Sequence, residues 1–209
     1  MNKKYAIFDL DGTLADSMVF WKNLAREYLT SKGITSIPPE FLEQIQAMTM
    51  SESAALFAQE FGLSGDPESE MNAMMDAHYC NDIPLKAGAL EYLQMLHHNN
   101  VQMCVASATA EHLMQACLKR LGILDYFQFV LSCETVGAGK TRPDVYHTCA
   151  VRFAALPPEI AVFEDAFYAV RTAKSAGYYV VGVYDESDEA NWAEVRQIAD
   201  ETIHDWNNP

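Results

Sequence analysis

The stretch Tyr5–Leu14, which reads YAIF and then DLDGTL, decides the fold that we expect for this chain. Four apolar residues in a row are typical of a strand that is buried on both faces of a parallel sheet. Two carboxylates follow, Asp9 and Asp11, and Gly12 then opens a turn. Because side chains alternate along a strand, we expect both carboxylates to point the same way from its carboxyl end. In open α/β sheets, ligands bind at this edge.

The two acids predict a site for a hard cation and a phosphate group. Carboxylates that point together are costly unless a positive charge lies between them, and Mg²⁺ prefers oxygen ligands. A calcium-binding loop is one alternative, but it needs further oxygen ligands and a closing Glu, whereas residues 13–20 offer only Asp16 and Ser17. A plain polar turn after a strand is the other alternative. Only the rest of the chain can distinguish it from a metal and phosphate site.

The motif at residues 9–14 resembles the first motif of the haloacid dehalogenase superfamily, which contains aspartate-based phosphohydrolases and mutases. The resemblance is to the subgroup with a small helical cap, to which β-phosphoglucomutase and sugar-phosphate phosphatases belong. It covers essentially the whole chain. It implies an α/β fold with a three-layer, Rossmann-like parallel sheet as the core and an inserted all-helical cap domain.

The order of apolar runs and helical periods also predicts a parallel, three-layer α/β sheet. Strands are expected at residues 5–8, 101–106, 129–131, 160–163 and 179–183. Helices in the same part of the chain are expected at about residues 88–98, 110–121, 143–155 and 187–198, with a further one that ends at residue 177.

Between residues 16 and 83 the pattern is helical, without a convincing strand. Helices are expected from Met18 to Gly33, from Pro38–Glu40, from Thr49 or Ser51 to Gly62, and from Asp66. We therefore expect residues 1–15 and 84–209 to form a catalytic core and residues 16–83 to form a cap. Because the chain crosses between the two parts twice at one edge, the cap is expected to act as a lid over Asp9.

Composition excludes several classes of function. The 209 residues carry a formal net charge of −15, which argues against nucleic acid as a partner because its phosphates require a basic surface. No apolar run approaches membrane length, and no signal-peptide pattern is present. Five scattered cysteines without metal-ligand spacing are typical of reduced thiols in a cytoplasmic protein. The expected partner is a small phosphorylated metabolite, and the sequence leaves the oligomeric state open.

Two further motifs are candidates for binding phosphate. Ser107 follows the expected strand at residues 101–106, where its hydroxyl and the N–H groups of Ser107 and Ala108 could hold a phosphoryl oxygen. A turn or cap residue is the alternative for Ser107. Lys140 lies in GAGKTRPD, which imitates the tail of a nucleotide P-loop, but Glu134 stands where that motif needs a glycine. The two positions instead match the second and third motifs of the family, and a solvated lysine is the alternative for Lys140.

The fourth motif supplies a second pair of acids. Glu164 and Asp165 follow the strand at residues 160–163 and match the family in position. A carboxylate pair there, opposite Asp9 and Asp11, would complete an oxygen cage for Mg²⁺. The resemblance implies that the ligands are Asp9, Glu164, Asp165 and the backbone carbonyl of Asp11.

The resemblance also implies how the reaction proceeds. Asp9 would be the nucleophile that forms an aspartyl phosphate, and Asp11 would be the general acid and then the general base. Ser107 and Lys140 would hold the phosphoryl oxygens that gather charge in the transition state. A non-catalytic phosphate-binding protein on this fold is an alternative of another class, but such a protein would be expected to have lost Asp9, Asp11 or Lys140, and all three are present.

We expect a phosphatase, with a β-phosphoglucomutase-like mutase as the alternative. In the mutase, a His ten residues after the second aspartate couples lid closure to the positioning of the acid/base, and an Arg of the cap grips the distal phosphate of the substrate. Trp21 and Met50 stand at the corresponding places here. Neither side chain can donate a charge-assisted hydrogen bond. Thr13 also favours the phosphatases. Arg142 is either a solvated side chain or a ligand for a second anionic group of the substrate.

Overall fold

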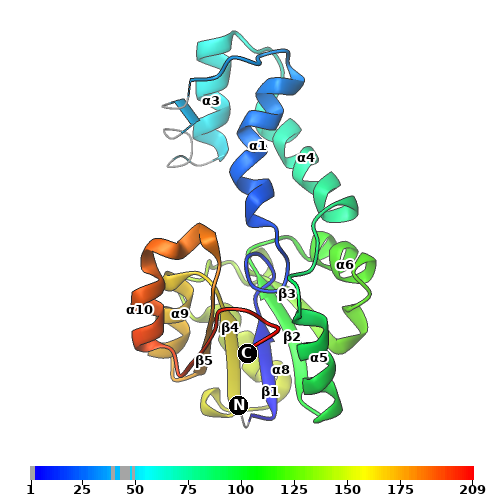
Figure 1. Ribbon diagram of the computed structural model, residues 1–209, viewed down its shortest axis with the longest axis vertical. Coiled ribbons are helices and arrows are strands. Elements are labelled where there is room, and N and C mark those ends of the chain that lie inside the picture. Colours follow the sequence, from blue (N-terminus) through cyan, green and yellow to red (C-terminus); the bar gives the residue numbers. More distant parts are fainter. Residues whose placement is uncertain (1–2, 39–40, 43–47, 49) are drawn as a thin grey trace. The chain divides into compact units, whose positions relative to one another are not determined.

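The computed structural model describes residues 3–38, 41–42, 48 and 50–209, and the contacts divide the chain into two compact units (Figure 1). The core unit consists of Met1–Ser17 and Ile83–Pro209, and the helical unit consists of Met18–Asp82. The predicted α/β core with an all-helical insertion is confirmed. Among the described residues, no helix is both long and apolar enough to cross a membrane.

The core unit is built on one six-stranded sheet in which every pairing is parallel. In chain order the strands are β1 (Tyr5–Phe8), β2 (Gln102–Ser107), β3 (Phe127–Ser132), β4 (Ile160–Glu164), β5 (Tyr179–Val183) and β6 (Glu201–Ile203). Their order across the sheet is β3-β2-β1-β4-β5-β6. Because β1 lies between β2 and β4, the strand order reverses at β1, and ligands bind at such a switch point in open α/β sheets.

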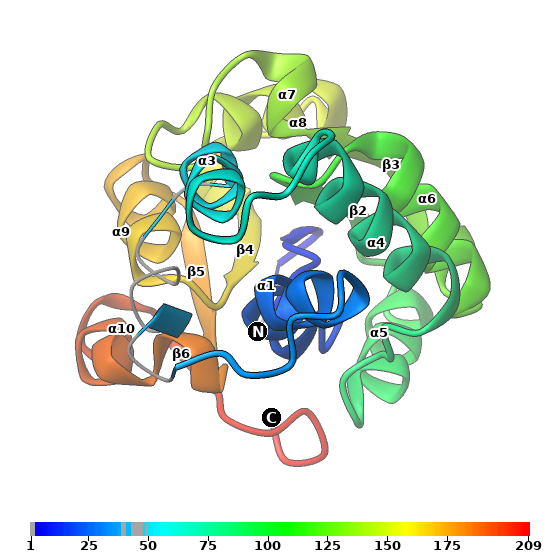
Figure 2. The same cartoon turned by 90° about the horizontal axis from the view of Figure 1, so that it is seen from above.

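Helices cover both faces of this sheet (Figures 1 and 2). They are α5 (Ala89–His98), α6 (Glu111–Arg120), α7 (Cys133–Val136), α8 (Asp144–Phe153), α9 (Phe167–Ser175) and α10 (Trp192–Ile198). Successive side chains of β1 point to opposite faces of the sheet. Ile7 is buried on one face, in the cluster formed with α8, α9 and α10. Phe8 lies on the other face and stacks on Phe163, with ring centroids 4.2 Å apart. Tyr92 of α5 packs edge-on against Phe163 on that second face. Burial on both faces explains the unbroken apolar run of β1.

The helical unit contains α1 (Met18–Ser31), α3 (Met50–Phe61) and α4 (Pro67–Asn81). The predicted start of α4 is confirmed, because the Asp66 side chain accepts a hydrogen bond from the Ser69 N–H at 3.1 Å. The predicted helix start at Pro39 and Glu40 and the predicted cap at Thr49 lie outside the described residues.

His78 joins two helices of the helical unit. Its ring nitrogens lie 2.9 Å from Glu27 Oε2 on α1 and 2.8 Å from Asp82 Oδ2 just after α4. Partial burial lowers the pKa of His78, but the hydrogen bonds to these two carboxylates raise it more, so the net shift is upward. The two carboxylates therefore favour the protonated form of His78, and its contacts with them link α1 to the end of α4.

Three elements differ in kind from the sequence-based expectation, and β2, β3 and β4 have other bounds than expected. The strand β6 and the four-residue helix α7 had no counterpart, and the helix expected at residues 187–198 is divided into a 3₁₀ segment, Glu186–Asn191, and α10. Asp188 explains the division: its backbone is non-helical, and its carboxylate accepts a hydrogen bond from the Phe167 N–H at 2.7 Å at the start of α9. None of the five cysteines, all of which lie in the described part of the chain, is in a disulfide bond, and four of them are buried.

Candidate functional site

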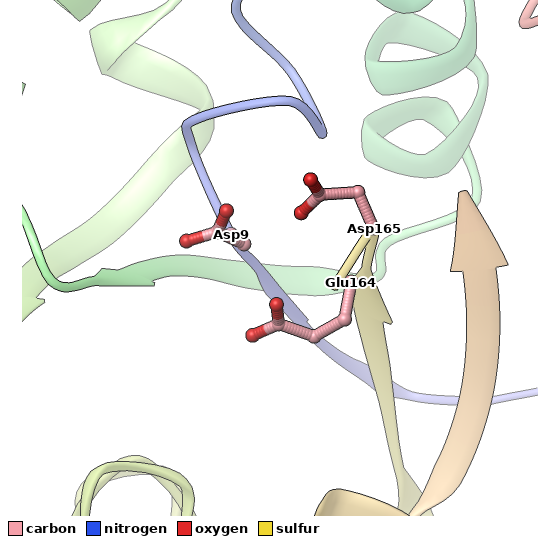
Figure 3. A group of neighbouring side chains, drawn as sticks. All are labelled: Asp9, Glu164 and Asp165. Carbon is pink, nitrogen blue, oxygen red and sulfur yellow. The ribbon is translucent and has the colours of Figure 1, made fainter. Parts of the chain in front are cut away.

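Three carboxylates converge at the carboxyl ends of two adjacent strands. One oxygen from each of Asp9, Glu164 and Asp165 lies within 4.8 Å of the others, and all three residues are buried (Figure 3). The parallel register explains this arrangement: Phe8 pairs with Phe163, so the residues that follow β1 and end β4 lie beside each other. The Asp9 N–H also donates to the Phe163 carbonyl at 3.0 Å.

Lys140 places an ammonium group among these acids. Its Nζ contacts Asp9 Oδ1 and lies 2.8 Å from Glu164 Oε1. Only 5% of the side chain is exposed, so Lys140 is not a solvated surface residue. Burial lowers the pKa of the Lys140 ammonium, but the charges of Asp9 and Glu164 raise it more, and the net shift is well upward. Lys140 therefore carries its charge at neutral pH.

Burial and mutual repulsion raise the pKa values of the three carboxyl groups, and the single Lys140 ammonium does not cancel these shifts. Burial raises the pKa of Glu164 to about 7, although Lys140 lowers it and Asp9 raises it further. Burial also raises the pKa of Asp9 and of Asp165, and repulsion between the carboxylates adds to both shifts. If all three carboxylates are ionised, the Lys140 ammonium offsets only one of their three negative charges. This oxygen-rich, negative arrangement fits a hard divalent cation such as Mg²⁺.

Asp11 lies in a different environment from Asp9. Its carboxylate accepts hydrogen bonds from the hydroxyl groups of Ser17 at 2.6 Å, Thr109 at 2.6 Å and Ser107 at 3.4 Å. The charge of Asp11 is still close enough to raise the pKa of Asp9. The site thus holds two carboxylates from one motif, one paired with an ammonium and one with hydroxyl groups. Two environments of this kind allow two chemical roles.

The sequence interpretation missed the donors that hold these acids. The sequence alone does not indicate that Thr109 and Ser17 donate to Asp11, or that Tyr146 donates to Glu164, whose Oε1 accepts its hydroxyl at 2.8 Å. Thr13 has a structural role that its residue type does not indicate, because its hydroxyl donates to Asp165 Oδ1 at 3.2 Å. Burial raises the pKa of Tyr146 well above its ordinary value, and the Glu164 charge adds to this, so the hydroxyl remains a donor.

The other candidates lie as follows. Ser107 is buried at the end of β2, next to β1, and Ala108 follows it in an exposed position. Arg142 donates to the carboxylate of Asp144 through Nη2 at 2.8 Å and Nε at 3.2 Å, and 68% of its side chain is exposed.

Two candidates, Trp21 and Met50, belong to the helical unit. Trp21 lies on α1 and its Nε1 donates to the Tyr79 hydroxyl at 3.2 Å, while Met50 is the first residue of α3.

Comparison with known proteins gives one family. The sequence pattern of the haloacid dehalogenase-like hydrolases matches residues 6–183. The β-phosphoglucomutase of Bacillus subtilis is 28% identical over 86% of this chain and 83% of its own. The fructose-1-phosphate phosphatase of Escherichia coli is 28% identical over 88% of this chain and 98% of its own. Among solved structures, a Thermotoga maritima protein provisionally assigned as a β-phosphoglucomutase has a TM-score of 0.82 and 22% identity over 96% of this chain and 94% of its own.

Proposed function

Because this chain belongs to the haloacid dehalogenase-like hydrolases, we propose that it is a Mg²⁺-dependent phosphatase that hydrolyses a small phosphorylated metabolite, such as a sugar phosphate. The observation that carries the proposal is the different surroundings of the two acids in the first motif. Asp9 contacts Lys140 within the acidic cluster, whereas Asp11 is held by hydroxyl groups. The similarity to a sugar-phosphate phosphatase supports the same class of substrate.

In the proposed reaction, Asp9 and Asp11 divide the chemistry. A carboxylate oxygen of Asp9 attacks phosphorus and forms an aspartyl phosphate, while the bond from phosphorus to the leaving oxygen breaks and Asp11 gives that oxygen a proton. Asp11 then takes a proton from a water molecule that attacks the aspartyl phosphate, which releases inorganic phosphate and restores Asp9. The Lys140 ammonium, with the hydroxyl of Ser107 and the N–H of Ala108, would hold the other phosphoryl oxygens.

The residues that would hold Mg²⁺ are Asp9, Glu164, Asp165 and the backbone carbonyl of Asp11. When bound there, the cation offsets the repulsion between Asp9 and the anionic phosphoryl group. The fit of the site to such a cation rests on the uncompensated negative charge of the three buried carboxylates.

We further propose that the helical unit is a lid. The segments through which the chain leaves and rejoins the core unit lie side by side, since the Asp16 N–H donates to the Pro84 carbonyl at 2.9 Å and the Lys86 N–H donates to the Leu14 carbonyl at 2.8 Å. Two adjacent crossings of this kind can serve as a hinge. The lack of a disulfide bond among the five cysteines supports a reducing compartment, the cytoplasm, as the place of action.

The test is phosphate release from a panel of sugar phosphates, phosphoglycolate and nucleotides, each with Mg²⁺ and with excess chelator. Turnover should require Mg²⁺ and disappear in Asp9→Asn, with the fold intact by circular dichroism. The matched control is Asp16→Asn, which alters an exposed acid of the same segment and should keep full turnover. Asp11→Asn should retain Mg²⁺ binding while turnover falls by at least ~100-fold. Activity of Asp9→Asn, or of the wild type in chelator, would contradict the mechanism.

A further inference from the structure

The carboxylate of Glu164 is held on one side only. Its Oε1 accepts the Tyr146 hydroxyl at 2.8 Å and also lies 2.8 Å from Lys140 Nζ. A carboxylate has about four lone-pair sites over its two oxygens, so two donors fill Oε1. Among the described residues, the side-chain hydrogen bond and the ion pair of Glu164 both end on Oε1. The two oxygens of Glu164 are therefore not equivalent.

The other two acids also receive a side-chain donor on one oxygen. Asp9 receives the Lys140 ammonium on Oδ1, and Asp165 receives the Thr13 hydroxyl on Oδ1 at 3.2 Å. Each carboxylate of the cluster therefore has one oxygen bound by a side-chain donor. This arrangement keeps the three groups close together in spite of their repulsion, and it fixes their rotation about the last side-chain bond.

We propose that Tyr146 is a positioning residue of the metal centre: its hydroxyl holds Glu164 Oε1 and thereby presents Oε2 to the divalent cation. The proposal rests on the proposed function, since it presumes that Mg²⁺ binds at Glu164. Tyr146 suits this task because its ring is fully buried on α8 and packs at 5.9 Å from the ring of Tyr178. A fixed ring gives its hydroxyl one direction, whereas Lys140 reaches the same oxygen through a flexible chain.

Tyrosine, not phenylalanine, is required by this role. A phenylalanine would fill the same space, but Glu164 would keep only Lys140 as its donor and could turn its oxygens. Mg²⁺ demands near-octahedral geometry with short bonds to oxygen, so a ligand that turns binds it less well. Residues that orient metal ligands through hydrogen bonds typically contribute about 10- to 100-fold to metal affinity.

The experiment compares wild type, Tyr146→Phe and Tyr178→Phe by calorimetric titration with MgCl₂ alone, without substrate. Tyr178 is the matched control because its hydroxyl bonds to His147 Nδ1 at 2.9 Å and does not reach the acids. We expect Tyr178→Phe to bind Mg²⁺ as wild type does and Tyr146→Phe to bind it about 10- to 100-fold more weakly. Near-UV circular dichroism and the melting temperature in chelator report whether each variant is folded.

Turnover provides a second measurement. In Tyr146→Phe the Mg²⁺ concentration for half-maximal activity should rise, and saturating Mg²⁺ should restore most of kcat. Unchanged Mg²⁺ affinity in Tyr146→Phe, or a lower kcat that Mg²⁺ does not restore, would overturn the role of Tyr146 and leave the proposed function standing. If the wild type itself binds no Mg²⁺ and needs none for turnover, the proposed function fails and this inference with it.

Discussion

Without metal, the stability of this protein should fall as pH rises through the acidic range, and Glu164 should be a main cause. Burial raises the pKa of Glu164 from an ordinary 4.5 to about 7. A carboxyl group with a raised native pKa stabilises the fold below its unfolded pKa and loses that contribution as pH rises through the native value. The window for Glu164 therefore runs from about pH 4.5 to about pH 7.

The size of the effect follows from this shift. Each pKa unit corresponds to about 1.36 kcal/mol. The contribution of Glu164 to the free energy of unfolding therefore falls by about 3 kcal/mol over this whole pH range. Below about pH 5.5 the protein approaches its sequence pI of about 4.6, where low net charge favours precipitation. Between about pH 5.5 and pH 8, the loss of unfolding free energy that Glu164 contributes is about 2 kcal/mol.

Urea unfolding of wild type and Glu164→Gln in excess chelator, at about pH 5.5 and pH 8, measures this contribution. The substitution removes the charge and keeps the side-chain volume. We expect wild type to lose about 2 kcal/mol more than Glu164→Gln between the two pH values, and saturating Mg²⁺ to remove most of that loss in wild type. An equal pH dependence in both proteins would refute the reasoning, because the loss would then come from other groups.

Four other outcomes are expected. Thr109→Val should lower kcat, because Asp11 loses a hydroxyl donor, while Thr148→Val should leave kcat unchanged. His78→Gln should speed hydrogen exchange in α1 and α4 more at about pH 5.5 than at pH 8, since a raised pKa means that stability is lost as pH rises. Arg142→Ala should leave KM unchanged even for a substrate with two anionic groups, because the guanidinium pairs with Asp144. β-Glucose 1-phosphate with a trace of the 1,6-bisphosphate and Mg²⁺ should give no glucose 6-phosphate, and efficient isomerisation would favour the mutase.

The sheet could be predicted because its strands are buried on both faces. The expected bounds of β1 and β5 match the structure, and β4 is one residue longer than expected. The three-residue β6 has two exposed residues and so carries no apolar run to detect. The division of the helix before α10 could not be predicted either, because Asp188 bonds to a residue twenty-one positions away at the start of α9.

The convergence of Asp9, Glu164 and Asp165 could be predicted from position alone. Each follows or ends a strand, and the carboxyl ends of parallel strands share one edge. Tyr146 could not be found in this way, because its contact with Glu164 depends on how α8 packs against the sheet. A motif in the sequence identifies the residues that end a strand, whereas the donors that orient them come from elements whose rotation only the packed fold determines.

Asp9 and Asp11 are close together in the sequence but lie in different surroundings. Alternation predicts only that both carboxylates point the same way. The chain leaves the strand after Phe8, and the N–H groups of Leu14 and Ala15 both donate to the carbonyl of Leu10, at 2.9 and 2.8 Å. This turn places Asp11 among hydroxyl groups while Asp9 remains beside Lys140. A nucleophile needs an ionised carboxylate, and a general acid must exchange a proton. The turn after β1 thus separates the two acids chemically although only one residue lies between them.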